Sequence, residues 1–242
     1  MAGRPLLRWA LDQAFAVPGL TRCVVVAPAD CVDEARALVT PQESERFVVV
    51  AGGAERTESV QAGLAHVGDA TAVLIHDAAR CLTPGRVFDD VLAALDGGAP
   101  AVVPGLVVTD TIKQVDADGH VVATPERATL RAIQTPQGFA RDVIDAAHAR
   151  ASATAASATD DAALVEGLGL PVLVVPGDPL AFKITVGTDL ETAQRLIDSG
   201  VVGPAPISTS EPIATCEQPT TPEPIDHADA NAPRVAPVPA EA

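Results

Sequence analysis

The sequence is poor in aromatic side chains, with no Tyr, one Trp and five Phe among 242 residues. Hydrophobic residues nevertheless make up 48% of the chain, so the core has to be built from Val, Leu, Ile and Ala. An apolar run of 18 residues is also absent, and no basic segment precedes an apolar stretch near the start. Neither a membrane span nor a secretory signal is therefore expected, and the predicted location is the cytoplasm.

Positive charge is scarce as well. Sixteen Lys and Arg stand against 32 Asp and Glu, which gives a formal net charge of −16. Unaided binding to nucleic acid or to an anionic membrane is therefore not expected. Only Lys113 and Lys183 are lysines, so each stands out as a compact ammonium in an Arg-rich chain, although chance explains this bias equally well.

Cysteine is sparse and scattered. The four cysteines include no CxxC pair, so neither a disulfide framework nor a zinc site is expected. This usage is typical of a reducing compartment.

What the sequence does contain is an alternation of apolar strand-like runs and helix-like segments. Helices are predicted at residues 5–17, 30–39, 58–67, 87–98, 140–152, 160–167 and 189–199, and strands at 23–27, 47–53, 73–75, 99–105, 171–177 and 181–186. Near-continuous apolar strands separated by helices are typical of a mostly parallel sheet with helices on both faces. The predicted fold class is therefore α/β, doubly wound and Rossmann-like.

Residues 107–123 interrupt this alternation. They form two short alternating runs about the turn Asp116–Gly119, which predicts a β-hairpin. A hairpin has no obvious place in a doubly wound sheet, so we expect an arm over about residues 107–135. An arm of this kind usually contacts a partner chain, which predicts a homodimer.

The last part of the chain changes in composition. The final 42 residues hold nine of the 21 prolines and six acids against one Arg, without apolar periodicity. Such a segment cannot bury enough surface to offset its ordering entropy. We therefore predict one domain over residues 1–201 and a disordered acidic tail over 202–242.

One strand ends in a pattern that raises the question of a site. After the run Val73–Ile75 come His76, Asp77 and Arg80, and two alanines separate the acid from the guanidinium. A polar loop that caps a strand explains this pattern. A ligand site explains it too, because open α/β sheets bind ligands at the carboxyl ends of their strands.

Several segments, taken in order, favour the second explanation. They read "GGAERTESVQAGL" (52–64), "HDAAR" (76–80), "TDTIK" (109–113), "RATLRAIQTPQGF" (127–139), "ATDDAALVE" (158–166) and "FKIT" (182–185). Each alone is weak evidence, since a turn or a helix cap has the same residues. In this order and spacing they resemble the 2-C-methyl-D-erythritol 4-phosphate cytidylyltransferases of the non-mevalonate isoprenoid pathway, over about residues 3–200.

The resemblance implies a reaction and a set of site residues. These enzymes join CTP to a sugar-alcohol phosphate with Mg²⁺ and release pyrophosphate, so catalysis rests on positioning and charge neutralisation. It assigns Asp77, Arg127 and Lys183 to catalysis, but no metal ligands. The resemblance implies that the nucleotide is bound by Gly53, Ala54 and Ser59. It places Asp77 and Arg80 at the substrate or near the metal, and it places Thr159 and Lys183 at the substrate phosphate. From the arm, the neighbouring subunit's site would be reached by Thr111, Arg127 and Thr135.

The chain also departs from this family. Family members open with a strand and a glycine-rich loop that cradles the triphosphate, whereas no GxGxR occurs here. We therefore expect the sheet to lack one central strand. This puts the activity of the chain as given in question. Either the true start lies upstream, or the chain is a truncated, non-catalytic paralogue.

Smaller departures are Cys81, where the family usually has Pro, and Ala181, where it usually has Asn. They put the strength of substrate binding in question. A cytidylyltransferase for another polyol phosphate, such as ribitol 5-phosphate, would share most of the motifs.

Overall fold

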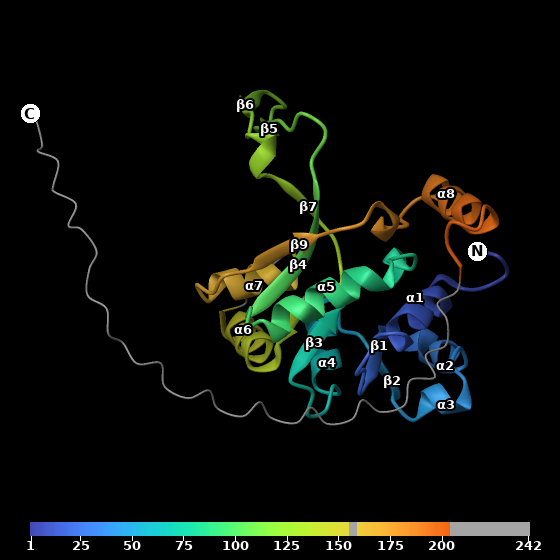
Figure 1. Ribbon diagram of the computed structural model, residues 1–242. Coiled ribbons are helices and arrows are strands. Elements are labelled where there is room, and N and C mark those ends of the chain that lie inside the picture. Colours follow the sequence, from blue (N-terminus) through green and yellow to red (C-terminus); the bar gives the residue numbers. More distant parts are fainter. Residues whose placement is uncertain (155–158, 204–242) are drawn as a thin grey trace, which may run out of the picture. The chain divides into compact units, whose positions relative to one another are not determined.

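The computed structural model describes residues 1–154 and 159–203 (Figure 1). The helices are α1 Leu6–Phe15, α2 Val32–Arg36, α3 Pro41–Ser44, α4 Arg56–Leu64, α5 Gly85–Asp96, α6 Arg141–Thr154, α7 Asp161–Gly167 and α8 Gly187–Asp198. The strands are β1 Cys23–Ala27, β2 Phe47–Ala51, β3 Ala72–Ile75, β4 Ala101–Val107, β5 Gln114–Val115, β6 Val121–Ala123, β7 Arg131–Ile133, β8 Gln137–Ala140 and β9 Leu173–Pro176. Apart from residues 202 and 203, the predicted tail lies outside the described residues.

The strands form an α/β sheet, as predicted. β8 pairs antiparallel with both β3 and β4, so β3 and β4 run in the same direction. β9 adds to β4 in parallel, β7 adds to it antiparallel, and β1 pairs in parallel with β2. The antiparallel strand β8 was not predicted, because its short sequence "QGFA" has no apolar run and reads as the end of the arm.

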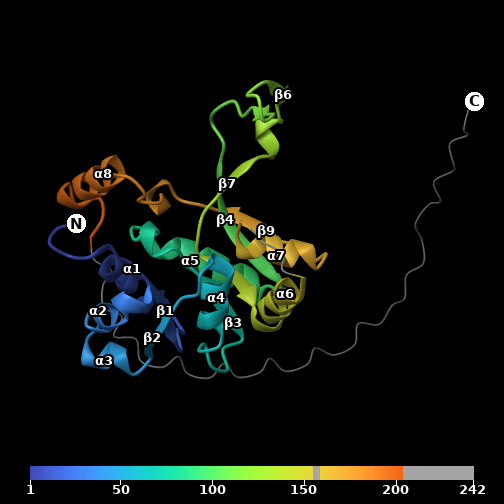
Figure 2. The same cartoon turned by 180° about the vertical axis from the view of Figure 1, so that it is seen from behind.

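Helices cover both faces of this sheet (Figures 1 and 2). Successive residues of a strand point to opposite faces, and β8 shows the consequence. A Cβ atom on Gly138 would meet Val91 and Leu95 of α5, whereas Phe139 is fully buried in the core with Ile144 of α6 and residues of α7. The sheet therefore lies between α5 and the α6–α7 layer.

A cavity separates the two groups of strands. Among the described residues, no backbone ladder joins β1 and β2 to the five-stranded sheet. A cavity of about 540 Å³ lies here, lined by residues of β1 and β3 and by α1 and α4. β1 and β3 therefore each keep one edge without a backbone ladder among the residues that the structure describes.

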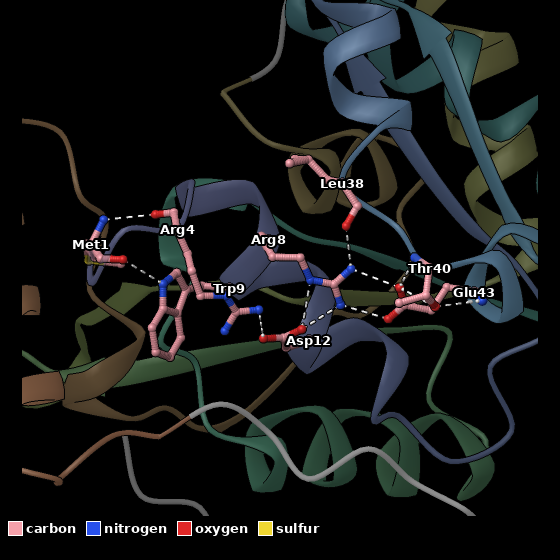
Figure 3. A network of polar contacts seen from close by, with 8 residues as sticks. All are labelled: Met1, Arg4, Arg8, Trp9, Asp12, Leu38, Thr40 and Glu43. Atoms are coloured by element: carbon pink, nitrogen blue, oxygen red, sulfur yellow. Dashed lines mark hydrogen bonds and ion pairs between the residues drawn. The ribbon is translucent and has the colours of Figure 1, made fainter.

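A network of charged side chains fixes α1 beside this cavity (Figure 3). The Arg8 guanidinium donates to Asp12 in the same helix and, at 2.8 Å, to Glu43 of α3. Arg4 stacks over the Trp9 ring at 4.9 Å and also pairs with Asp12. The helix that covers the cavity is therefore tied to its neighbours by directional contacts.

The predicted hairpin is present but shorter than expected. β5 and β6 pair antiparallel, and Gly119 has a positive φ of 84° in the turn between them, a conformation that glycine adopts without steric cost. The hairpin projects from the sheet in Figure 1. β4 continues to Val107, and β7 returns to pair with it. The arm thus ends near residue 130 and does not extend to 135.

Two other predicted elements are wrong. The segment 181–186 is not a strand, because the Asp178 side chain accepts from the Leu180 amide at 2.6 Å and caps a 3₁₀ turn, Pro179–Ala181. The Ile184 amide then donates to the Ala79 carbonyl at 2.9 Å and not to a ladder. The helix expected at 30–39 is split into a 3₁₀ turn, Ala29–Cys31, and α2, which ends at Arg36.

No described helix is both long and apolar enough to cross a bilayer.

Candidate active site

A carboxylate with two cations stands at the carboxyl end of β3. The Lys183 ammonium lies 3.0 Å from the Asp77 carboxylate, and Arg80 Nε lies 3.7 Å from the same oxygen. Arg80 is held within reach by the 3₁₀ turn Ala78–Arg80, and Lys183 by the backbone bond that follows it, from Ile184 to Ala79. The structure thus brings together three residues that the sequence assigned to substrate binding.

Thr135 belongs to this group and not to the arm. Its hydroxyl accepts from the Asp77 amide at 3.0 Å and lies 3.0 Å from His76 Nδ1. The side chain is buried, with 6% of the residue exposed. The expectation that Thr135 reaches a neighbouring subunit is therefore wrong, because the return of β7 to the sheet places it beside Asp77 of its own chain.

His76 is a member of the site that sequence reasoning missed, although it stands directly before Asp77. Burial lowers the pKa of His76 to about 4, against the opposing effect of the Asp77 charge. The imidazole is therefore neutral near pH 7, with its ring 5.1 Å from that of Phe88. The buried ring holds the Thr135 hydroxyl in place, and this hydroxyl accepts the hydrogen bond from the Asp77 amide.

Arg80 contributes positive charge from a partly buried position. Burial lowers its pKa, and the nearby Asp77 opposes this effect. Its terminal nitrogen donates to the Ala181 carbonyl at 2.8 Å, which ties the Lys183 segment to the end of β3. Ala181 and Cys81, the two departures from the family pattern, are both fully buried.

The loop after β2 was expected to contact the nucleotide, and its backbone N–H groups are the donors that such a loop can offer. In the structure these groups already have partners: the Gly53 amide donates to Ser59 Oγ at 3.1 Å and the Ala54 amide to Glu58 at 2.8 Å. A ligand that used these donors would have to displace the two side chains. Ser59 itself lines the cavity, which also reaches Asp77.

The remaining predicted site residues lie elsewhere. Thr111 and Arg127 are exposed on the arm, where Arg127 donates to the Thr109 carbonyl at 2.9 Å. Thr159 is exposed next to Asp160, whose carboxylate accepts from Gln137 at 2.8 Å. Gln137 is paired with Ile75 in the sheet, so the segment that carries Thr159 lies near the end of β3.

Fold and site together define a class of protein. An α/β sheet with a cation-flanked carboxylate at a strand end, and with Ser59 of the helix after the glycine loop on the same cavity, is the arrangement expected of a nucleotidyltransferase. The IspD family model, described as 2-C-methyl-D-erythritol 4-phosphate cytidylyltransferase, matches residues 1–199. The chain belongs to this family and is a cytidylyltransferase.

Individual relatives agree with this assignment. The chain is 52% identical over 198 residues to 2-C-methyl-D-erythritol 4-phosphate cytidylyltransferase from Nocardia farcinica, an alignment that covers 82% of this chain and 84% of the relative. It is 48% identical over 200 residues to the enzyme of the same name from Rhodococcus jostii, with 83% and 85% covered.

Solved structures of the family have the same fold. The 4-diphosphocytidyl-2C-methyl-D-erythritol synthase from Anaerococcus prevotii superposes with a TM-score of 0.75 at 28% identity, covering 82% of this chain and 88% of that one. For 2-C-methyl-D-erythritol 4-phosphate cytidylyltransferase from Thermus thermophilus the TM-score is 0.67 at 34% identity, with 81% and 90% covered.

Proposed function

We propose that the chain transfers a cytidylyl group from CTP to 2-C-methyl-D-erythritol 4-phosphate, yielding 4-diphosphocytidyl-2-C-methyl-D-erythritol and pyrophosphate for isoprenoid precursor synthesis. The observation that carries the proposal is the grouping of Lys183 and Arg80 about Asp77, which lines the same cavity as Ser59. Two cations against one carboxylate leave a local positive charge in a chain whose net charge is −16. Anionic substrates require such a local excess.

These residues act by holding two anions together. A phosphate oxygen of the sugar-alcohol phosphate forms a bond to the α-phosphorus of CTP, and the bond to the bridging oxygen breaks so that pyrophosphate leaves. Lys183 is half exposed and would turn from Asp77 to the substrate phosphate. One cation about 4 Å from a phosphate charge offsets on the order of 4 kcal/mol at an effective dielectric constant of 20, before desolvation.

Thr135 and His76 act on the acid and not on the phosphates. Their hydrogen bonds fix the backbone of Asp77, so its carboxylate can accept from the hydroxyl groups of the substrate. Arg80 supports the same pocket through its bond to the Ala181 carbonyl.

The family implies Mg²⁺, and the residues present fit such an ion. One oxygen of Asp77 carries both contacts to cations, and the other has no protein partner among the described residues. Mg²⁺ is typically held by one or two carboxylates together with substrate phosphates, so Asp77 would hold it. When bound, the ion neutralises charge that develops on the phosphates. The exposed cluster Asp116, Asp118 and His120 fits less well, because an Asp116 oxygen already accepts two amides of the turn.

We further propose a homodimer in which the arm of each subunit enters the partner's site. The support is an unusual concentration of exposed apolar side chains on and beside the arm: Val107, Ile112, Val115, Val121, Val122 and Ile133. Exposed apolar side chains that gather on one segment favour a protein contact there. In the dimer Arg127 and Thr111 would meet the substrate phosphate from the partner's side.

The reaction can be tested by product analysis of the full chain with CTP, Mg²⁺ and each of two acceptors, methylerythritol phosphate and ribitol 5-phosphate. The expected product forms from the first, and Lys183→Ala lowers its rate by roughly a hundredfold. Arg195→Ala, which removes an exposed cation on α8, is the matched control and leaves the rate unchanged. Product from ribitol 5-phosphate alone, or from neither acceptor, would contradict the proposal.

A further inference from the structure

The proposed mechanism does not use Asp161, a fully buried acid. Asp161 is the second acid of the "ATDD" motif and the first residue of α7. Its exposed fraction is 0%, and each of its two oxygens has one partner. Arg56 donates to Oδ2 at 2.6 Å, and His148 Nε2 lies 3.0 Å from Oδ1. The preceding acid, Asp160, has the different task of capping the helix.

Asp161 is held in its charged form. Burial alone would raise its pKa, but hydrogen bonds from His148 and Arg56 outweigh burial and leave the pKa below its ordinary value. The ring of His148 is itself buried, and its other nitrogen has no hydrogen-bond partner among the described residues. Because an ionised carboxylate can only accept, Nε2 of the ring donates the hydrogen bond to Asp161.

Arg56 connects this buried acid to the cavity. It is the first residue of α4, directly after the glycine loop, and its side chain is 39% exposed. It lines the cavity together with Ser59, His76 and Asp77. Asp161 occupies one nitrogen, and the structure gives the guanidinium no second protein partner among the residues it describes. The remaining N–H groups are therefore free to bind a ligand in the cavity.

Stability alone is a poor explanation for this arrangement. A buried carboxylate is costly to desolvate, and a pair of this kind often contributes little net stability. What the pair does provide is direction, because a guanidinium presents its donors in a planar, fixed fork. A second acceptor with negative charge, such as a phosphate, suits the donors that remain.

We propose that Asp161, supported by His148, is a positioning residue that holds Arg56 so that its guanidinium binds a phosphate oxygen of the nucleotide. This inference rests on the proposed use of CTP. It assigns Arg56 to nucleotide binding beside Ser59, and it gives the second acid of "ATDD" a role distinct from that of Thr159.

A double-mutant cycle measured by calorimetric titration of CTP into the full chain tests the inference. Arg56→Ala and Asp161→Asn are each expected to weaken CTP binding at least about tenfold, as for a lost hydrogen bond to a charged group. The double variant should bind no more weakly than Arg56→Ala, because Asp161 acts only through Arg56. Arg36→Ala, which breaks an exposed ion pair with Asp33, is the control and should bind normally.

The possible results separate the inference from the proposed function. Losses that add in the double variant would mean that Asp161 does not act through Arg56, and would overturn the inference. Variants that bind CTP as the wild type does while their thermal midpoints fall would mean that Arg56 and Asp161 only stabilise the fold. If the wild-type chain does not bind CTP, the proposed function itself is overturned. Should Asp161→Asn fail to fold, Arg56→Lys decides, since it keeps the charge but loses the fork. Undiminished affinity in that variant would overturn the inference.

Discussion

At the scale of single residues, His76 shows how a site can depend on a group that never touches the substrate. The ring is buried beside Phe88 and contacts Thr135, which receives the Asp77 amide. Protonation of the His76 ring would place a positive charge in a buried position, near the positive charge of Arg80. The neutral ring is therefore part of what holds Asp77 in place.

We expect His76 to make the stability of the fold depend on pH. Its pKa falls from 6.5 to about 4 in the folded chain, so the unfolded chain binds more protons between these values. The contribution of the neutral His76 ring to the free energy of unfolding is then complete above pH 6.5. It declines as the pH falls, by roughly 2 kcal/mol at about pH 4.5. Urea unfolding at neutral and acid pH measures this loss.

The variant His76→Gln provides the comparison, because all other titrating groups are shared with the wild type. Its free energy of unfolding should fall less steeply below neutral pH. Equal pH dependence of the two chains would show that His76 does not titrate as inferred.

At the scale of elements, β8 has little room for a larger side chain at Gly138. This strand lies between β3 and β4, and it follows shortly after Thr135, which belongs to the site. Its Gly138 faces α5 so closely that a Cβ would lie 2.9 Å from a methyl group of Leu95 and closer still to Val91. The glycine is needed here for space and not for an unusual φ.

Gly138→Ala is therefore expected to destabilise the chain by about 1–3 kcal/mol through overpacking. Gly85→Ala, at the first residue of α5, is the matched control. No atom lies within 4 Å of a Cβ there, and Ala is favoured over Gly in a helix by about 1 kcal/mol. Chemical denaturation of both variants checks the contrast, and equal stabilities would refute the close packing of β8 on α5.

At the scale of the whole molecule, the proposed homodimer would build each active site from two chains. Lys183 lies at the site of its own chain, whereas Arg127 is exposed on an arm that carries exposed valines. If the arm crosses to a partner, each site combines Lys183 of one subunit with Arg127 of the other.

Mixing two inactive chains tests this arrangement. Arg127→Ala and Lys183→Ala homodimers should each lose about a hundredfold in transfer rate. In a heterodimer of the two, one site inherits both substitutions and the other inherits neither, so one active site per heterodimer is expected. Subunit exchange, followed by light scattering or labelled chains, has to be established alongside the assay. Mixtures that exchange subunits but stay inactive would show that Arg127 acts within its own chain.

The resemblance to the family supplied the candidate site residues, whereas the sequence by itself determined the α/β class and the hairpin. These follow from local rules: apolar runs bury strands, 3.6-residue periodicity buries one face of a helix, and a glycine turn reverses a hairpin. Asp77 and Arg80 could be read as a pair because they stand three positions apart, on one turn.

Only the tertiary structure decided which distant residues meet. Lys183 reaches Asp77 because a capped turn replaces the strand predicted at 181–186 and bonds to Ala79. Thr135 joins the site because β7 returns to β4 before it, and Arg56 meets Asp161 across 105 residues of sequence. Periodicity carries no information about such long-range contacts, since they are set by the packing of whole elements and by buried charges that require a partner.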